Sequence, residues 1–261
     1  MMPSAFRGQP EGRRLTDVVV FYYSIVFENN GGMLVASSGR AVKDDLYEQF
    51  ARIGKSVANP KRIELLDLLC QGERSVEVLA GAAAMSVTNT SAHLRVLREA
   101  RLVDTRKEGT RVIYRLADEA VCEFFISLRD LARDRFAEVE QITRDYFEAR
   151  DEFEPVGRAE LLARADAGQV IVLDMRPDEE YEAGHIPGAI SVPLKRLKHT
   201  LSSLPRDTEI VAYCRGPYCV LAPQALELLH RNGFRARRLD GGLPDWRRDG
   251  FPVAVGNGDR V

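Results

Sequence analysis

Two cysteines lie close together in residues 213–220, which read Tyr-Cys-Arg-Gly-Pro-Tyr-Cys-Val. The first, Cys214, follows an apolar run at residues 209–213 that is typical of a buried strand, and it precedes a turn and a helix. Backbone N–H groups in such a loop form an anion-binding hollow that lowers the pKa of a thiol. The pattern therefore predicts a reactive thiolate at Cys214, with Arg215 adding positive charge. A cysteine that only fills the core is the alternative.

Further motifs surround this loop. A short apolar strand is predicted at residues 170–174, and the chain continues through Asp174-x-Arg176, Glu-x-Tyr at residues 179–181 and Gly-His-Ile-Pro-Gly-Ala at residues 184–189. After the loop, residues 240–246 read Asp-Gly-Gly-Leu-Pro-Asp-Trp. In this order the motifs resemble those of the rhodanese family over residues 155–253.

This resemblance implies sulfur-transfer chemistry. In rhodaneses the loop cysteine attacks a sulfane-sulfur donor, becomes a persulfide and passes the sulfur to a nucleophile, and here that residue is Cys214. Asp174 and Arg176 are expected to brace the loop, with Glu179 and Glu180 as alternative partners for Arg176. The residues expected to form the catalytic site are Cys214, Arg215, Gly216, Pro217, Tyr218, Cys219, Asp174 and Arg176.

The end of the loop departs from the family pattern. Many rhodaneses end the loop with Arg or Ser, whereas Cys219 ends it here. Cys219 either attacks a persulfide on Cys214, leaving a disulfide or polysulfide bridge, or faces the core at the start of the next helix. Phosphatases of this fold need an arginine at that place, so phosphoryl transfer is not expected. His185, in a glycine-rich turn, is assigned a structural hydrogen bond.

The N-terminal half carries helical patterns. Apolar residues at helical spacing predict three helices, which start near residues 62, 75 and 86. Two β-prone runs, residues 102–106 and 111–116, flank a turn with Gly109 and predict a hairpin. Helix, turn, helix and hairpin in this order form a winged helix-turn-helix.

This half resembles the ArsR/SmtB family of transcriptional repressors. The matching motifs are Pro-x-Arg at residues 60–62, Ser-Val-x-x-Leu-Ala at 75–80 and His-Leu-x-x-Leu-Arg-x-Ala-x-Leu-Val at 93–103. The resemblance implies that the helix after Ser86 enters the major groove of double-stranded operator DNA and that the hairpin reaches the backbone. The residues expected to contact DNA are Thr88, Asn89, Ser91, Ala92, Arg95, Lys107 and Arg111. A winged helix that serves protein association is the alternative.

Residues 119–150 contain no Pro or Gly and place apolar side chains at steps of three and four, which predicts one long amphipathic helix. Such a helix extends about 45 Å, too long to bury its apolar stripe on one small domain. We expect a homodimer in which a second copy covers this helix and a helix at residues 46–57; packing on the rhodanese domain is the alternative. The expected interface residues are Phe50, Ile53, Phe124, Leu128 and Leu131.

The predicted fold class is two domains, a mainly α winged helix-turn-helix (α+β) followed by an α/β rhodanese domain with a parallel central sheet. The predicted boundaries are a tail at residues 1–42, the winged domain at 43–118, the long helix at 119–154, the rhodanese domain at 155–254 and a tail at 255–261. We expect Met33 to be the natural start, an expectation that a native peptide from upstream of Met33 would contradict.

The composition indicates two ordinary globular domains, with 261 residues, a net charge of -2 and four cysteines. Four scattered cysteines favour a reducing cytoplasm over a disulfide scaffold, and Cys70 and Cys122 are interpreted as small core residues. Because neither has a second Cys or His beside it, no metal site is expected, and no cofactor is expected. The apolar run at residues 18–27 is too short to cross a membrane.

Together these patterns predict a dimeric DNA-binding regulator, most simply a repressor, whose rhodanese domain senses or transfers sulfane sulfur. A persulfide on Cys214, formed from a donor such as thiosulfate or polysulfide, would alter operator affinity through the long helix. The alternative is a sulfurtransferase whose winged domain serves association or localisation. A third reading is a thiol-based metal- or metalloid-sensing repressor.

Overall fold

The computed structural model describes residues 39–146 and 155–256. The expected N-terminal tail up to residue 38, the end of the long helix at 147–154 and residues 257–261 lie outside the described residues. Contacts divide the chain before Phe50: residues 39–49 are the described part of the first unit, and Phe50–Val261 is one compact unit. No described helix combines the length and the hydropathy that a membrane crossing requires.

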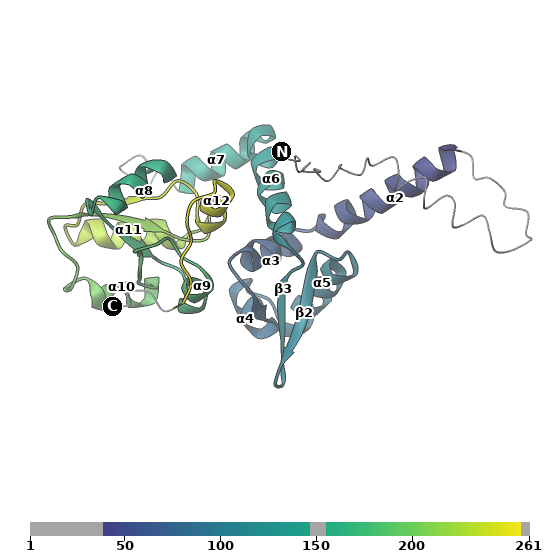
Figure 1. Cartoon of the computed structure of the whole chain (residues 1–261), viewed down its shortest axis with the longest axis horizontal. Coiled ribbons are helices and arrows are strands. Elements are labelled where there is room, and N and C mark those ends of the chain that lie inside the picture. The colour runs from purple at the N-terminus through teal and green to yellow at the C-terminus, as the bar shows by residue number, and fades with distance from the viewer. Residues whose placement is uncertain (1–38, 147–154, 257–261) are drawn as a thin grey trace, which may run out of the picture. The chain divides into compact units, whose positions relative to one another are not determined.

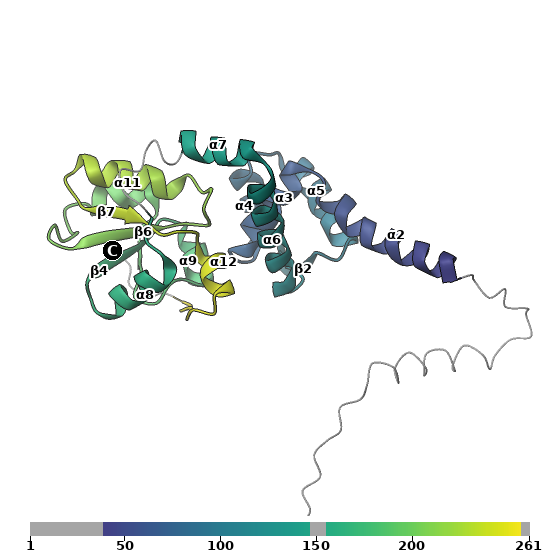
Figure 2. The same cartoon turned by 90° about the horizontal axis from the view of Figure 1, so that it is seen from above.

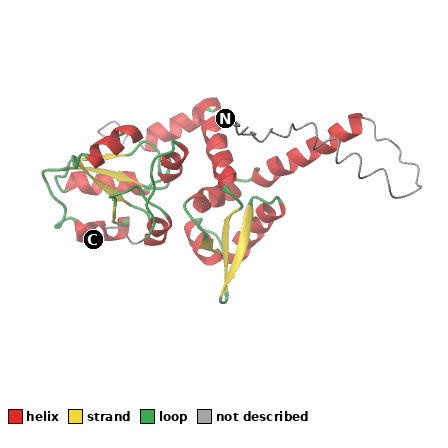
Figure 3. Ribbon diagram, in the orientation of Figure 1, coloured by secondary structure: helices red, strands yellow, loops and turns green. Residues whose placement is uncertain are grey.

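The winged domain consists of helices and a small antiparallel sheet (Figures 1 and 3). Its elements are α2 (Gly39–Val57), α3 (Pro60–Cys70), β1 (Arg74–Ser75), α4 (Val76–Ala82), α5 (Val87–Glu99), β2 (Val103–Glu108) and β3 (Arg111–Leu116). The side chains of Asn59, Ser75 and Ser86 each accept a hydrogen bond from a backbone N–H in the first turn of the helix that follows. Such caps satisfy N–H groups that have no partner inside the helix. The predicted helix starts near residues 62, 75 and 86 are therefore confirmed to within two residues.

One core holds these helices together. Leu65 and Leu66 of α3 belong to the same cluster of buried residues as Leu94 and Leu97 of α5. These side chains therefore fix the positions of α3 and α5 against each other within one core.

The predicted hairpin is confirmed as β2 and β3, which pair antiparallel along their whole length. Its turn needs Gly109, whose φ of 59° is a left-handed conformation that glycine adopts at no steric cost. The sequence does not predict β1, in which Arg74 and Ser75 pair with β3. Two residues are too few to form a pattern, so only the neighbouring strand of the wing defines β1.

The prediction of one long helix is wrong over the described part of its range. The structure has α6 (Glu119–Arg135) and α7 (Ala137–Tyr146), separated at Phe136, whose φ of -115° and ψ of 109° are extended. No Pro or Gly causes the break. Together with Tyr218 and Val220 of the rhodanese domain, α7 lines a hollow. α7 buries none of its own residues, so a second copy and the rhodanese domain both stay predictions for the partner that covers it.

The rhodanese domain has a parallel four-stranded sheet with the order β5-β4-β6-β7. Its elements are α8 (Arg158–Asp166), β4 (Val170–Asp174), α9 (Asp178–Ala183), β5 (Ile190–Ser191), α10 (Leu194–Thr200), β6 (Glu209–Tyr213), α11 (Leu221–Arg231), β7 (Ala236–Arg238) and α12 (Leu243–Arg248). The strands predicted at residues 170–174 and 209–213 are confirmed.

Helices cover both faces of this sheet. Along β6, Ile210 and Ala212 belong to one buried cluster and Val211 and Tyr213 to the other, because successive side chains of a strand point to opposite faces. Figure 2 shows α11 on one side of the sheet and α8 on the other. Cys214 follows directly at the carboxyl end of β6.

Candidate functional site

The loop of residues 214–220, in which the sequence predicts the catalytic cysteine, connects β6 to α11 and is called the catalytic loop from here on because of that prediction. Cys214 is 2% exposed, and its Sγ lies 3.6 Å from the carbonyl oxygen of Cys219 and 3.9 Å from that of Gly216. The backbone N–H of Cys219 donates to the Gly216 carbonyl at 3.1 Å and closes the turn. Cys219 is half-buried. The loop therefore holds the two thiols together but exposes them unequally.

The two thiols have opposite pKa shifts. Burial raises the pKa of Cys214 well above its ordinary value, and the neighbouring Cys219 adds to the increase. The hydrogen bond from Cys214 lowers the pKa of Cys219, and backbone N–H groups and Arg215 lower it further. The expectation of a lowered pKa at Cys214 is thus reversed, because desolvation there outweighs the loop's N–H donors. Of the two thiols, Cys219 is therefore the one that loses its proton more readily, and Cys214 donates a hydrogen bond to it.

Asp174 and Arg176 lie behind the loop and are fully buried. The Arg176 guanidinium donates to both carboxylate oxygens of Asp174 at 2.6–3.1 Å, so it pairs with Asp174 rather than with the acids that follow it. Oδ2 of Asp174 also accepts from the Tyr213 hydroxyl at 2.5 Å. Since Tyr213 immediately precedes Cys214, this network holds the end of β6 from behind.

Arg215 is paired with Glu180 of α9. Its Nε and Nη2 donate to the carboxylate at 2.6–3.1 Å. Glu180 is fully buried and also pairs with Arg74 of the winged domain at 3.1 Å. A carboxylate shared by two arginines therefore links the catalytic loop to β1.

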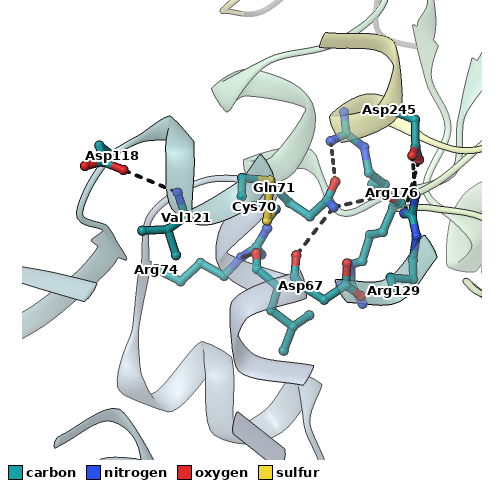
Figure 4. Close-up of a disulfide and its surroundings, with 12 residues drawn as sticks. Asp67, Cys70, Gln71, Arg74, Asp118, Val121, Arg129, Arg176 and Asp245 are labelled. Carbon is teal, nitrogen blue, oxygen red and sulfur yellow. Dashed lines mark hydrogen bonds and ion pairs between the residues drawn. A yellow bond between two sulfur atoms is a disulfide. The ribbon is translucent and has the colours of Figure 1, made fainter. Parts of the chain in front are cut away.

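Gln71, the C-cap of α3, makes a second link to the loop (Figure 4). Its side chain is fully buried; Oε1 accepts from Nη1 of Arg176 at 3.2 Å, and Nε2 donates to the carbonyl oxygen of Arg215 at 3.1 Å. One amide thus satisfies groups on both sides of the catalytic site. Because a buried amide without partners costs about 1–3 kcal/mol, these bonds hold α3 against the loop.

Arg129 of α6 makes a third link. Its Nη2 lies 2.6 Å from Oδ1 of Asp245, and Oδ2 of Asp245 accepts from the backbone N–H of Gly242 at 3.0 Å. A Cβ on Gly242 would lie 2.4 Å from the carbonyl atoms of Arg215. Only glycine fits against the loop here, which explains the place of the Gly-Gly pair in the motif at residues 240–246.

The sequence does not reveal Gln71, Arg74 or Arg129 as part of the site, nor does it predict that Glu180 pairs with Arg215 or Asp245 with Arg129. Gln71 and Arg176 are 105 residues apart in the chain, and Arg129 and Asp245 are 116 apart. No local spacing encodes such pairs. The one available signal is that Gln71 is a polar residue directly after the buried run Leu68-Leu69-Cys70.

His185 has the structural role that its turn predicts. It is 2% exposed, its ring stacks on that of Tyr181 at 3.7 Å, and its Nδ1 is hydrogen-bonded to the Tyr181 carbonyl oxygen at 2.8 Å. With its ring enclosed in this way, His185 holds the turn after α9.

The first turns of α5 present a polar face to solvent. Among the residues expected to contact DNA, Thr88, Asn89, Ala92 and Arg95 are exposed and Ser91 is half-buried. Thr90 between them is buried, and its hydroxyl donates to the carbonyl of the preceding turn at 2.9 Å. The expected contacts thus share the face that points away from the core, as a recognition helix requires.

The wing presents two further cations. Lys107 and Arg111 are exposed next to the hairpin turn. Their neighbour Arg106 instead pairs with Glu73 at 2.5 Å and with Glu108 at 2.7 Å. Lys107 and Arg111 are therefore better placed than Arg106 to meet phosphate.

Cys70 and Cys122 form a disulfide bond, with an S–S distance of 2.38 Å and a Cα–Cα distance of 5.5 Å (Figure 4). The interpretation of two separate core cysteines is therefore wrong, although both residues do lie in or against the core cluster. The bond ties the end of α3 to α6. In the part of the chain that the structure describes, no group of three His, Cys, Asp or Glu side chains could hold a metal ion.

The expected dimer residues divide into two groups. Phe50, Phe124 and Leu131 expose 63%, 36% and 54% of their surface. Ile53 and Leu128 are half-buried, and Leu128 lines a cavity beside the catalytic loop. Part of the predicted apolar stripe is thus covered within the chain itself.

Comparison with known proteins matches the N-terminal and the C-terminal parts of the chain to two different families. Residues 59–105 match the family described as bacterial regulatory protein, arsR family, and residues 158–249 match the rhodanese-like domain. The HTH-type transcriptional regulator Rv0324 of Mycobacterium tuberculosis is 45% identical over 221 residues, which cover 83% of this chain and 97% of that protein.

Two other similarities cover one domain each. A sulfurtransferase of Allochromatium vinosum is 33% identical over 95 residues, which cover 36% of this chain and 87% of that protein. The solution structure of a homodimeric winged helix-turn-helix DNA-binding domain from Mycobacterium bovis is 45% identical, with a TM-score of 0.35, and the match covers 36% of this chain and 87% of that one.

Proposed function

Because this chain belongs to the arsR family of bacterial regulatory proteins and carries a rhodanese-like domain, we propose that it is a dimeric DNA-binding repressor that responds to sulfane sulfur. A persulfide on Cys214 changes the affinity of the winged domain for its operator. The loop that receives sulfur and the helix that contacts DNA lie in one compact unit, Phe50–Val261, which supports a direct connection between them.

The observation that carries this proposal is the position of Gln71. Its amide is bonded to the Arg215 carbonyl, one residue after Cys214, and to Arg176 behind the loop. Cys214 is 2% exposed and its Sγ lies 3.6 Å from the carbonyl oxygen of Cys219, which supports the inference that an added sulfur atom crowds the loop. Loading Cys214 therefore displaces the loop and breaks or stretches its bond to Gln71.

The displacement reaches the DNA-contacting helix through α3. Gln71 caps α3, and α3 packs on α5 through Leu65 and Leu94, which share one close-packed core. Packed elements of this kind transmit a shift rather than absorb it. This route replaces the one through a long helix, which the break at Phe136 makes less direct.

The DNA-binding part of the proposal depends on two copies of the chain. Exposed apolar side chains of α2 and α6 form the dimer interface, and the two α5 helices read a palindromic operator with half-sites about one helical turn apart. The partners are double-stranded DNA, a second copy and a sulfane-sulfur donor such as thiosulfate or polysulfide. A repressor works in the compartment that holds the DNA, which supports a cytoplasmic location.

The second thiol, that of Cys219, provides a way to remove the added sulfur from Cys214. The Cys219 thiolate attacks the inner sulfur of a Cys214–S–S–H persulfide, the S–S bond breaks, and HS⁻ leaves with the electron pair. A disulfide between Cys214 and Cys219 remains, and thiols of the cell reduce it. The lowered pKa of Cys219 and the contact of Cys214 Sγ with the Cys219 carbonyl at 3.6 Å support this step.

The second candidate is a sulfurtransferase whose winged domain serves only association or localisation. The similarity of the rhodanese domain to a sulfurtransferase favours it. In that case sulfur loading leaves DNA binding unchanged, and so does substitution of Gln71.

Operator affinity tests the proposal. The reduced chain is titrated onto its own upstream DNA with and without thiosulfate or a polysulfide, as native protein, Cys214→Ser and Gln71→Ala. We expect sulfur loading to change the affinity of the native chain severalfold, which corresponds to a coupling of about 1–3 kcal/mol. Cys214→Ser loses both the persulfide and the response, whereas Gln71→Ala forms the persulfide, seen by mass spectrometry, and loses the response.

The matched control is Gln224→Ala, an exposed glutamine on α11, which keeps the persulfide and the response. If the native chain binds the operator tightly and with the same affinity with and without a sulfur donor, the proposal is contradicted and the second candidate is left.

A further inference from the structure

A cavity of about 400 Å³ lies between the catalytic loop and the winged domain. Cys219 and Pro217 of the loop form one wall, and α3 and α6 form the other with side chains such as Ile63, Asp67 and Leu128. Cys214 does not line it. A molecule in the cavity therefore meets the half-buried Cys219 before the enclosed Cys214.

The cations around this cavity are already paired. Arg129 in the wall pairs with Asp130 and Asp245 at 3.0 and 2.6 Å. Arg215 of the loop pairs with Glu180 at 2.6 Å. The site thus offers an incoming anion no unpaired positive charge.

Asp67 adds a negative charge to the wall. No other described residue hydrogen-bonds to its carboxylate or forms an ion pair with it, in contrast to the other wall carboxylate, Glu64, which pairs with Lys61 at 2.8 Å. Burial raises the pKa of Asp67 to about 6, and Arg215 and Arg129 limit the increase. Above that pH the carboxylate is ionised and repels a second anion across a largely apolar space.

We propose that this cavity is the donor site of the rhodanese domain and that it takes an uncharged organic polysulfide, R–S–S–S–R with apolar substituents, in preference to the thiosulfate dianion. The proposal rests on the proposed function and names the donor that serves it. The carbon-rich wall buries the substituents, and Cys219 faces the sulfur chain.

The reaction balances with the organic trisulfide and the two loop cysteines as its reactants. The Cys219 thiolate attacks the central sulfur, one S–S bond breaks, and R–S⁻ leaves, which gives Cys219–S–S–S–R. Cys214 passes its proton to the departing R–S⁻ and attacks the sulfur bonded to the Cys219 sulfur, which releases a second R–S⁻. The product is a Cys214–S–S–S–Cys219 trisulfide. The two cysteines are oxidised and the donor is reduced to one thiol and one thiolate, so no other oxidant is needed. Attack of a cellular thiol on the Cys219 sulfur breaks one S–S bond, releases the Cys214 persulfide of the proposed function and leaves a mixed disulfide on Cys219.

The walls of the cavity come from both domains. The donor therefore binds next to the contacts that connect α3 and α6 to the catalytic loop. The cavity is lined by Asp67 of α3, four residues before Gln71, and by Arg129 of α6, which is bonded to Asp245. Formation of the trisulfide places an added sulfur atom between Cys214 and Cys219, in the loop that these helices contact.

Mass spectrometry of the full chain tests the donor site, with dimethyl trisulfide and sodium thiosulfate as probes. We expect dimethyl trisulfide to give a product that has gained one sulfur atom and lost two hydrogens at Cys214 and Cys219. Ala132→Phe, which fills the cavity from α6, lowers this rate at least tenfold. The matched control is Ala120→Phe, an exposed alanine on the same helix, which reacts at the native rate.

A second variant tests the charge argument without changing the shape of the cavity. Asp67→Asn raises the rate of reaction with thiosulfate severalfold and leaves the rate with dimethyl trisulfide unchanged. The donor site is overturned if Ala132→Phe and Ala120→Phe react at equal rates, or if Asp67→Asn reacts with thiosulfate at the native rate. Sulfur-dependent DNA release by thiosulfate would still uphold the proposed function. Failure of every donor to modify either cysteine overturns both.

Discussion

Burial decides the chemistry of the individual residues in this site. Cys214 and Cys219 share one loop, and backbone N–H groups lower the pKa of both, yet burial raises the pKa of Cys214 well above its ordinary value while the hydrogen bond from Cys214 lowers the pKa of the half-buried Cys219. Asp67 follows the same rule, because its carboxylate lies among apolar side chains at the cavity wall. The charge state of each group is therefore set by its surroundings rather than by its residue type.

We predict that Asp67→Asn stabilises the chain at neutral pH. The folded chain raises the pKa of Asp67 from 3.8 to about 6, so native stability falls as pH rises through that window and the carboxyl loses its proton. The amide has no proton to lose, and the variant gains about 1–3 kcal/mol over native at pH 7.5. Urea unfolding at pH 4 and pH 7.5 measures the difference. A gain of equal size at both pH values would show that the charge is not the cause.

Glu180, Asp245, Arg129 and Arg215 are the other charged groups that act on Asp67. The two arginines stay charged over this range and the two acids are paired with arginine, so the change between pH 4 and 7.5 reports Asp67.

Gly242→Ala tests the contact that shapes the catalytic loop. Its Cβ would lie 2.4 Å from the Arg215 carbonyl and 2.5 Å from the backbone nitrogen of Gly216, so the loop must shift. We expect a loss of about 1–3 kcal/mol in the free energy of unfolding, together with altered reactivity of both loop cysteines towards iodoacetamide. Gly157→Ala, in open space in the same domain, is the control and leaves the reactivity unchanged. Native reactivity in Gly242→Ala would refute the contact.

At the scale of elements, α3 and α6 form the connection between the two domains. α3 ends at Gln71, which is bonded to the loop, and α6 carries Arg129, which is bonded to Asp245 of α12. The disulfide between Cys70 and Cys122 joins these two helices to each other. Two of the links to the rhodanese domain therefore involve this cross-linked pair of helices, and a third is the pair of Arg74 in β1 with Glu180.

Reduction of that disulfide should lower stability. The bond closes a loop with a sequence separation of 52, and such a cross-link contributes about 2–4 kcal/mol by restricting the unfolded chain. We expect the free energy of unfolding to fall by that amount when a reductant is added, as measured by urea denaturation. The double variant Cys70→Ser, Cys122→Ser is the control, and an equal effect of reductant on it would rule out this bond as the source.

On the scale of the whole molecule, several large apolar side chains of the described residues are exposed. Phe50 of α2 and Leu131 of α6 expose more than half of their surface. Large exposed apolar residues of this kind mark association surfaces. They support the dimer in the proposed function.

Phe50→Glu and Leu131→Glu should each convert the dimer to a monomer, since a buried unpaired charge at an interface is costly. We expect light scattering to give half the native mass, and operator affinity to fall because one half-site contact is lost. Val255→Glu replaces an apolar residue that is 73% exposed outside the predicted interface and should leave the mass unchanged. A native mass for both interface variants would exclude this surface.

The sequence by itself determined the elements and the places of the reactive groups. The strands at residues 170–174 and 209–213, the caps at Ser75 and Ser86, and the hairpin around Gly109 all follow from neighbours a few residues apart, so local patterns predict them. The cysteine at the end of β6 and the exposed face of α5 follow from the same patterns.

Only the tertiary structure decided how these parts act on one another. The bond between Cys70 and Cys122 and the position of Gln71 against the loop depend on contacts between distant segments, the second across 144 residues. The lowered pKa of Cys219 depends on the hydrogen bond from Cys214, the thiol that the fold encloses. Such properties arise from burial and desolvation, and these exist only once the two domains have packed together.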